Sequence, residues 1–295
     1  IAKHKRFDSL FAILGIFVIA SLTVTLLILF IDLVIDGYPR FSLDFFGNFP
    51  SRRAARAGIL SAWVGSSLVL IITFLSAVPL GVAAGVYLEE YAKKNWLSDL
   101  IEINVSNLAG VPSIIYGLLA LGLFVYQFGL GQTILTAGLT LALLMLPIVI
   151  VSTREAIRAI PIHIREAAYA VGATKWQVCL QHVVPYSYGG ILTGVIIGMA
   201  RAIGETAPII TIGALTFIAF LPPSPIGLEA PFINFDWLNS GFTVLPIQMF
   251  NWISRPQLAF HLNAAATGAV IIMLTLLMNG AAIKIRYNIR KKIKW

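Results

Sequence analysis

Long stretches without a charged side chain alternate along this chain with short polar segments. A bilayer's hydrocarbon core is about 30 Å thick, and a helix needs about 20 apolar residues to cross it. Residues 9–31, 57–88 and 257–283 contain no Asp, Glu, Lys or Arg and reach that length. We therefore predict that each of these stretches crosses a membrane as one helix.

Two other charge-free stretches complete the pattern. Residues 103–153 are too long for one crossing, and the run Gln127-Phe-Gly-Leu-Gly-Gln132 predicts a turn that divides them into two helices. Residues 176–200 begin a further helix, which we expect to continue past Arg201 and Glu205. The chain is thus predicted to be an all-α membrane protein with six crossing helices and both termini on one side.

Lysine and arginine are distributed unevenly between the two sides of this layout. Fifteen lie on the side of the termini and five on the other side. Because cytoplasmic loops carry the excess of basic residues, both termini are predicted to be cytoplasmic. Arg52, Arg53 and Arg56 run against this rule. They either attract phosphate or an acidic protein face, or form a chance cluster, and the sequence leaves this open.

The layout divides the chain into three segments. Residues 1–56 hold an anchor helix and a first outer loop, residues 57–290 a core of five helices, and residues 291–295 a basic tail. Within the core, residues 153–185 form a long cytoplasmic segment, and residues 221–262 form an outer loop rich in Pro. The basic C-terminal end suits contact with anionic lipid headgroups.

Composition excludes several classes of protein. Hydrophobic residues make up 58% of the chain and charged residues 12%, with a mean hydropathy of +0.88. A soluble domain carries about 25% charged residues, so a soluble globule, a disordered chain and a nucleic-acid binder are excluded. The sequence contains no G-x-x-x-x-G-K-[ST], G-x-S-x-G or H-E-x-x-H motif, and its four histidines are scattered. We therefore expect no ATPase, hydrolase or metal chemistry in this chain.

One pair of opposite charges falls deep within a predicted crossing. Arg201 and Glu205 are four residues apart and share a helical face with Gly198. An arginine at the centre of a bilayer costs about 2.5–3.5 kcal/mol even on lenient scales, so such residues face the bundle interior or a wet cavity. The pair is either a structural salt bridge or part of a substrate path. Because guanidinium matches oxyanions, the path hypothesis favours an anion.

The same predicted helix carries a small-residue signature. Gly190, Gly194 and Gly198 form G-x-x-x-G-x-x-x-G, which is typical of closely packed membrane helices.

The cytoplasmic segment predicts a hairpin of short helices. Pro161 can begin a helix and Gly172 can end it, and Thr174 with Gln177 predicts a capping box for the next helix. We expect an apolar stripe with an i, i+3, i+4, i+7 spacing, made of Ile164, Ala167, Ala168 and Val171. Arg165 and Glu166 are expected on the outer face. The hairpin is either an interfacial connector or a lever that docks on a cytoplasmic partner.

This hairpin contains a recognisable motif. The run Glu166-Ala-Ala-Tyr-Ala-Val-Gly172, followed thirteen positions later by Pro185, resembles the EAA loop of ABC importer permeases. His182 and Val184 stand where the family pattern has Ile and Leu.

Three further runs narrow the resemblance. Arg201-Ala-Ile-Gly-Glu-Thr-Ala-Pro208 resembles the signature of phosphate-specific permeases of the PstA type. The run from Leu245 to Pro256 resembles the outer loop of that subunit, and Pro79 to Tyr91 the end of its second helix. The similarity extends over most of residues 57–295.

The resemblance implies the type I permease fold of ABC importers and a set of site residues. It places Gly198, Arg201, Glu205 and Thr206 on the path of inorganic phosphate. It assigns coupling to the ATPase to Arg165, Glu166, Ala167, Ala168, Gly172 and Pro185.

The resemblance also implies an assembly in the cytoplasmic membrane of a bacterium or archaeon. The expected partners are a sister phosphate permease in a heterodimer, two ATP-binding subunits, and a periplasmic or lipid-anchored phosphate-binding protein. Membrane lipid surrounds the complex, and no nucleic acid takes part. ATP and Mg²⁺ are used by the partner subunits, so this chain is expected to hold no cofactor, metal or catalytic residue.

Three alternatives remain open. The first is an ABC importer permease for another oxyanion or small solute, which would share the EAA loop. The second is a secondary transporter or channel working alone, for which an internal repeat is usual. The third is a structural or sensory subunit in which the Arg201–Glu205 pair serves packing only.

Overall fold

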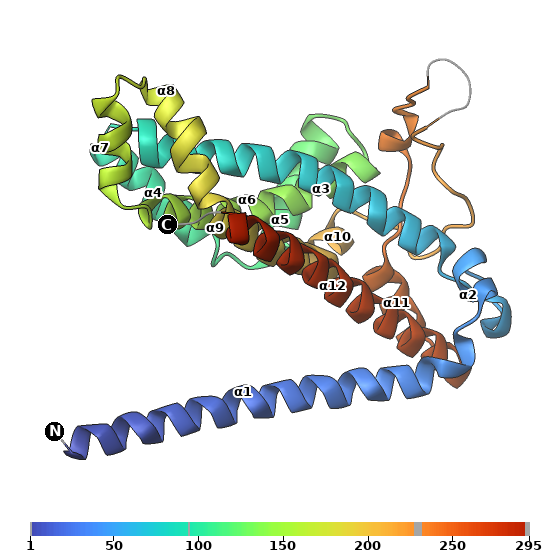
Figure 1. The fold of residues 1–295 in the computed structure, drawn as a ribbon. Helices are drawn as coiled ribbons and strands as arrows, with labels where there is room; N and C mark the ends of the chain where they lie inside the picture. Colours follow the sequence, from blue (N-terminus) through green and yellow to red (C-terminus); the bar gives the residue numbers. More distant parts are fainter. Residues whose placement is uncertain (1, 94, 227–231, 293–295) are drawn as a thin grey trace.

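The computed structural model describes residues 2–93, 95–226 and 232–292, and these are almost entirely helical (Figure 1). The long helices are α1 (Ala2–Gly37), α3 (Leu60–Val86), α6 (Ile134–Arg158), α9 (Val184–Gly204) and α12 (Leu258–Lys292). The shorter ones are α2 (Leu43–Gly47), α4 (Trp96–Leu108), α5 (Ser113–Ala120), α7 (Ile162–Ala170), α8 (Lys175–Val178), α10 (Ala207–Thr211) and α11 (Leu245–Ile253). Three π-helical segments continue these helices: Tyr87–Tyr91 extends α3, Leu121–Gln127 extends α5, and Cys179–Val183 joins α8 to α9. The 3-10 helices Tyr38–Arg40, Ala54–Arg56 and Asp236–Asn239 lie in connecting segments.

Five helices in the described residues are long and apolar enough to cross a membrane, and a bent pair can supply a sixth crossing. Their spans are Leu10–Arg40, Leu60–Tyr91, Ile134–Arg158, Lys175–Gly204 and Leu258–Ile289. Figure 1 shows that the N-terminal end of α1 and the C-terminal end of α12 both point toward the end of the molecule that holds α7 and α8. The predicted set of crossings is thus present, with one difference in the third.

The third crossing is not the single straight helix expected at the start of residues 103–153. It consists of Trp96–Leu108 and Ser113–Gln127, between which the chain bends by 106°. Pro112 explains the break, because it lacks an N–H and forces the residue before it out of the helical conformation. The first arm begins well before residue 103 and carries the charged Asp99 and Glu102, which a search for charge-free runs excludes.

Helices α3, α6 and α9 form the packed centre of the fold. Ala77, Met145, Val149 and Val195 belong to one buried cluster that joins all three helices. A Cβ on Gly190, Gly194 or Gly198 would collide with side-chain atoms of α6, on Ala156, Ser152 and Met145 respectively. The three glycines therefore let α9 approach α6 closely, as the small-residue signature predicted.

Helix α9 ends earlier than expected. Its last residue is Gly204, and Glu205 has an extended backbone with φ −75° and ψ 124°. Pro208 accounts for this end, because a proline cannot donate to the carbonyl four residues before it and clashes with that carbonyl. The chain makes the single turn of α10 and then leaves the helical conformation at Gly213, which has φ +88°. The prediction that the fifth helix continues past Glu205 is wrong.

Helix α1 lies apart from the rest of the molecule along most of its length (Figure 1). Its side chains from position 10 to 29 are exposed in this single chain. Its C-terminal end is closely packed, because a Cβ on Gly37 would lie 2.6 Å from the Ala266 Cα of α12. The hydrophobic surface of α1 is available to lipid or to another membrane subunit.

Candidate functional site

The Arg201–Glu205 pair lies where α9 ends. The Arg201 Nε donates a hydrogen bond of 3.0 Å to the Glu205 Oε1. The Arg201 side chain is 35% exposed and the Glu205 side chain 16%. Among the described residues, the two terminal nitrogens of the guanidinium have no hydrogen-bond partner. Glu205 thus holds Arg201 by one edge and leaves donors that can bind an oxyanion.

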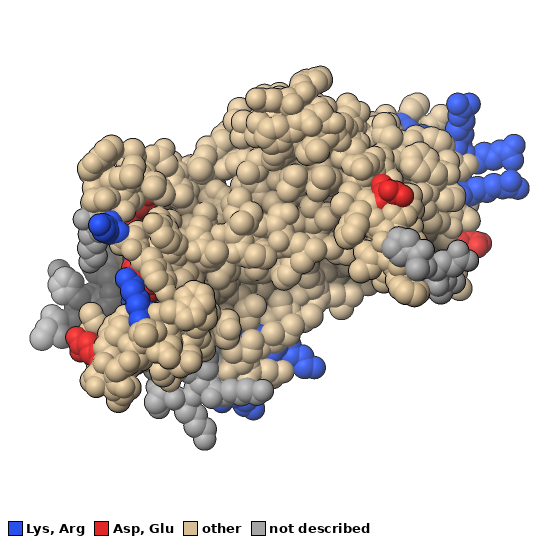
Figure 2. Space-filling view, turned by 90° about the horizontal axis from the view of Figure 1, so that it is seen from above, with Lys and Arg blue, Asp and Glu red and all other residues tan. Residues whose placement is uncertain are grey.

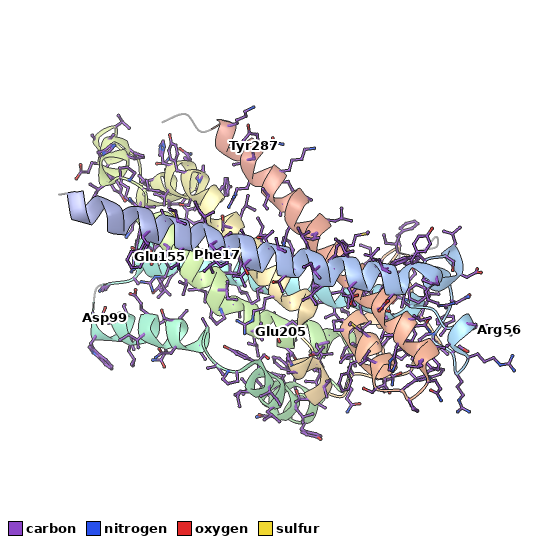
Figure 3. The ribbon with its side chains drawn as sticks, turned by 90° about the horizontal axis from the view of Figure 1, so that it is seen from below. Phe17, Arg56, Asp99, Glu155, Glu205 and Tyr287 are labelled. Carbon is purple, nitrogen blue, oxygen red and sulfur yellow. The ribbon has the colours of Figure 1, made fainter. Side chains whose placement is uncertain are left out.

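A narrow pocket lies against Glu205 on its protein side. Its volume is about 20 Å³, and its lining includes Ser66 of α3 and the apolar Leu141 and Ile209. That volume holds about one water molecule and is too small for a tetrahedral oxyanion. Figure 3 shows Glu205 between the end that carries Arg56 and the end that carries Glu155. This pocket therefore does not hold the anion, whereas the Arg201 side chain is accessible from its exposed side.

The other two predicted path residues lie in different surroundings. Thr206 directly precedes α10, is half-buried, and its hydroxyl has no hydrogen-bond partner within the described part of the chain. Gly198 is buried, and a Cβ there would lie 2.7 Å from the Met145 Cγ. The structure thus places Thr206 beside the ion pair and Gly198 in the α6–α9 contact. The assignment of both to the substrate path stays a prediction.

Helix α5 also lies beside the Arg201–Glu205 pair, and the sequence did not indicate this proximity. Gly117 packs so closely on α10 that a Cβ there would lie 2.6 Å from the Pro208 Cα. The hydroxyl of the neighbouring Tyr116 donates a hydrogen bond of 2.7 Å to the Leu108 carbonyl, across the bend of the third crossing. The bent third crossing therefore forms one wall of the region around the ion pair.

The predicted coupling hairpin has the expected local structure. Helix α7 begins directly after Pro161, and Gly172 follows it with φ +86°, in the left-handed region. Thr174 and Gln177 form both bonds of a capping box at the start of α8. The π-helical segment Cys179–Val183 then leads into α9, where Pro185 occupies the first turn and is half-buried.

The expected apolar stripe of α7 is only half buried. Ile164 and Ala168 contact a buried cluster that includes Ile157 and Val183. Ala167 is exposed, and Val171 is 85% exposed. Val171 and Ala167 therefore join Glu166 on the outer surface of the hairpin, where Ile162 and Trp176 are exposed as well. This surface combines apolar and acidic side chains.

Arg165 does not lie on the outer face with Glu166, as expected. Its side chain is 17% exposed and points into the protein, where Nε and Nη2 donate to one Glu90 carboxylate oxygen at 3.0 and 2.8 Å. It also donates to the carbonyls of Ile157 and Ile160, both at 3.0 Å. Ile157 lies in the last turn of α6 and Ile160 lies two residues beyond its end. Arg165 thus joins α7 to α6 and to the π-helical end of α3.

A second group of charges ties three helices together at the same end of the molecule. Arg154 contacts Glu89 at 3.4 Å and Glu102 at 2.5 Å, and Arg158 contacts the same carboxylates at 2.9 and 3.0 Å. These residues come from α6, from the end of α3 and from α4. Sequence analysis missed this group, although two arginines four positions apart at the end of a charge-free run were a visible signal.

Substitutions at Gly172 test whether the left-handed turn positions the hairpin. Gly172→Val is expected to reduce transport severalfold at equal abundance in the membrane, because a left-handed backbone costs a side-chain-bearing residue about 1–2 kcal/mol and a β-branched one more. Gly172→Asn is the matched control, because asparagine tolerates this conformation. Substrate uptake by membrane vesicles of the two variants measures the difference. Equal uptake by both would mean that the turn does not position the hairpin.

The chain matches a known family over most of its length. Residues 77–293 match the family described as "Binding-protein-dependent transport system inner membrane component". The chain is 33% identical over 281 residues to the probable ABC transporter permease protein YqgI of Bacillus subtilis, covering 90% of both proteins. It is 34% identical over 229 residues to the phosphate transport system permease protein PstA of Mycobacterium leprae, covering 77% of this chain and 70% of the relative. The PstA protein of Yersinia pestis is 32% identical over 250 residues, covering 83% and 78%.

Solved structures support the same fold. A chain of the MetNI methionine ABC transporter, in an inward-facing conformation, matches with a TM-score of 0.56 and 16% identity, covering 76% of this chain and 94% of that one. At this identity the likeness concerns the fold alone, which is that of an ABC importer permease. A permease of this class works with ATPase subunits and a substrate-binding protein, and is not itself a catalytic enzyme. The chain is therefore a multi-pass integral membrane protein that belongs to the family of binding-protein-dependent transport system inner membrane components.

Proposed function

We propose that this chain is the PstA-type permease subunit of an ATP-driven importer of inorganic phosphate. The proposal is carried by one observation in a chain related to phosphate permeases over most of its length. Within the part of the chain that the structure describes, the two terminal nitrogens of the half-exposed Arg201 have no hydrogen-bond partner. Guanidinium nitrogens in a planar fork match the oxygens of phosphate and bind them through charge-assisted hydrogen bonds.

Phosphate entering the membrane loses its hydration, and Arg201 offsets part of that loss. Glu205 neutralises the guanidinium while the path is empty, and Thr206 offers a hydroxyl beside it. The exposed side of Arg201 faces the path between this chain and a sister permease. Binding must stay weak, because an anion held too tightly cannot leave toward the cytoplasm.

Energy for transport comes from two ATP-binding partner subunits, which use ATP and Mg²⁺. The outer surface of the α7 hairpin, with Glu166, Ala167 and Val171, docks on one of them. Arg165 joins α7 to the ends of α3 and α6, so a displacement of the hairpin moves these helices with it. In this way closure of the two ATPase subunits opens the permease to the outside, and hydrolysis of ATP returns the permease to its inward-facing state.

Both termini lie in the cytoplasm and residues 221–262 on the outer side, where a phosphate-binding protein delivers the substrate. The membrane is the cytoplasmic membrane of a bacterium or archaeon. Lipid surrounds α1 and the other exposed apolar helices.

A second candidate is import of another oxyanion. Sulfate presents the same tetrahedral arrangement of oxygens to Arg201, and geometry at this residue does not separate the two ions. Discrimination between them belongs to the binding protein, which can enclose the anion and sense its protons.

Uptake of labelled phosphate tests the proposal. Phosphate-starved cells that lack their own copy of this subunit would express this chain, with and without excess unlabelled sulfate. Rescue of phosphate uptake that sulfate does not reduce supports a phosphate importer. Rescue of sulfate uptake in place of phosphate uptake contradicts it, provided that the chain copurifies with its partner subunits.

A further inference from the structure

Three exposed arginines lie at the end of the molecule opposite the coupling hairpin. They are Arg52, Arg53 and Arg56, in and beside the 3-10 helix Ala54–Arg56. Figure 3 places Arg56 at the extremity of this end, and Figure 2 shows basic side chains projecting separately from it. Within the described residues, none of the three forms a side-chain hydrogen bond or an ion pair. Their charges contribute nothing to internal packing.

The backbone that carries these arginines is nevertheless firmly held. Arg40 donates to the carbonyls of Ala55 and Ala57 at 3.0 and 2.8 Å, and Asn263 of α12 donates to the Ala54 carbonyl at 3.0 Å. Ala57 itself is part of a buried cluster with the aromatic residues Phe45, Trp252 and Phe260. The turn around Ala54–Arg56 is thus a rigid mount from which the three arginine side chains extend.

The mount also presents apolar side chains. Leu43 of α2 is 91% exposed, and Phe41 and Phe46 beside it are exposed as well. Helix α2 is joined to the mount, because the Ile59 N–H donates 2.8 Å to the Phe45 carbonyl and the Gly58 N–H donates 3.1 Å to the Phe49 carbonyl. Arginine and aromatic residues on a rigid support are enriched in protein–protein interfaces.

We propose that Arg52, Arg53 and Arg56 form a docking surface for an acidic face of the substrate-binding protein. The inference rests on the proposed function, because it is the import cycle that brings that protein to this side of the membrane. A protein surface fits better than free phosphate, because the arginines do not converge around a common hollow. It fits better than lipid headgroups, because basic side chains project outward from the end of the molecule, where Arg56 lies at the extremity.

Substrate-delivery kinetics test this surface. The complete complex, with its partner subunits, is reconstituted in nanodiscs or liposomes, and ATP hydrolysis and phosphate uptake are measured against the concentration of phosphate-loaded binding protein. In the variant Arg52→Gln/Arg53→Gln/Arg56→Gln, we expect the half-saturating concentration of binding protein to rise about tenfold or more, with an unchanged maximal rate, because charges at an interface rim act mainly on association. The dependence on salt is expected to weaken in the same variant.

A matched control removes positive charge at the other end of the molecule. Lys284→Gln/Lys291→Gln alters two exposed lysines of α12, and its saturation curve is expected to match that of the wild type. If the triple variant also matches the wild type at every salt concentration, the docking surface is overturned while the proposed function stands. If the wild-type complex shows no uptake driven by the binding protein, the proposed function fails first, and the docking inference with it.

Two other results would assign the arginines to different ligands and overturn the inference. The first is labelled phosphate that binds to the wild-type complex without binding protein and is lost in the triple variant. The second is a shift in the saturation curve that appears only in membranes containing anionic lipid.

Discussion

Replacing Arg201 by glutamine is expected to lower phosphate uptake about ten- to a hundredfold, since a hydrogen bond to a charged group contributes about 1.5–3 kcal/mol. Glutamine keeps a polar side chain but removes the permanent charge and the planar fork of donors. Arg201→Lys keeps the charge without the fork of donors. Its phosphate uptake is therefore expected to lie between that of the wild type and that of Arg201→Gln. Initial rates of labelled phosphate uptake, at matched abundance of the assembled complex, measure both variants.

A double variant separates transport from packing at this pair. Arg201→Gln leaves the Glu205 carboxylate, which is only 16% exposed, without its partner. Arg201→Gln/Glu205→Gln removes both charges and relieves that unpaired group. If the pair only stabilises the fold, the double variant recovers uptake. If the guanidinium binds the anion, the double variant assembles normally and still transports poorly.

Replacing Arg165 by alanine is expected to have the largest effect on stability. Its loss removes bonds to Glu90, Ile157 and Ile160 and leaves the Glu90 carboxylate, which is 10% exposed, without a partner. Breaking a buried ion pair from one side costs about 3–5 kcal/mol. We expect a lower thermal unfolding temperature of the detergent-solubilised complex, and fewer phosphate ions transported per ATP hydrolysed by the complexes that survive.

The controls for Arg165 use other charges at the same end of the molecule. Glu155→Ala removes a carboxylate that is 65% exposed and 3.5 Å from Arg158, and exposed pairs of this kind contribute less than about 1 kcal/mol. Arg165→Ala/Glu90→Ala removes both charged partners and is expected to unfold at a higher temperature than Arg165→Ala. A normal ratio of transport to hydrolysis in this double variant would contradict the role of the pair in coupling.

The pattern of charge-free runs predicted the crossings well because the bilayer imposes a simple rule on composition and length. That rule contains nothing about tertiary contacts, and it failed where such contacts matter. In α4, Glu102 lies in a helix of the bent crossing because Arg154 and Arg158 of α6 neutralise it. A search along one segment cannot detect partners that come from residues more than fifty positions away.

The helical face of α7 shows a similar limit. The spacing of Ile164 and Ala168 correctly placed them on the buried side, but Val171 was expected there and is exposed. Arg165 was expected on the outer face, because it is not one of the residues of the apolar stripe. It lies inside because Glu90 and the carbonyls of Ile157 and Ile160, at and just beyond the end of α6, are placed around it. Local periodicity cannot indicate this, since the partners belong to other helices.

The sequence by itself determined the features that depend on neighbouring residues. These are the long apolar helices, the close approach permitted by Gly190 and Gly194, and the left-handed turn at Gly172. Each follows from chain length, steric freedom or helical periodicity.

Only the tertiary structure decided how these features are combined. It set the 106° bend of the third crossing and turned Arg165 toward Glu90. It also fixed the turn that presents Arg56. In each case the physical reason is a contact between segments distant in the sequence, or a backbone break whose geometry the packed helices set.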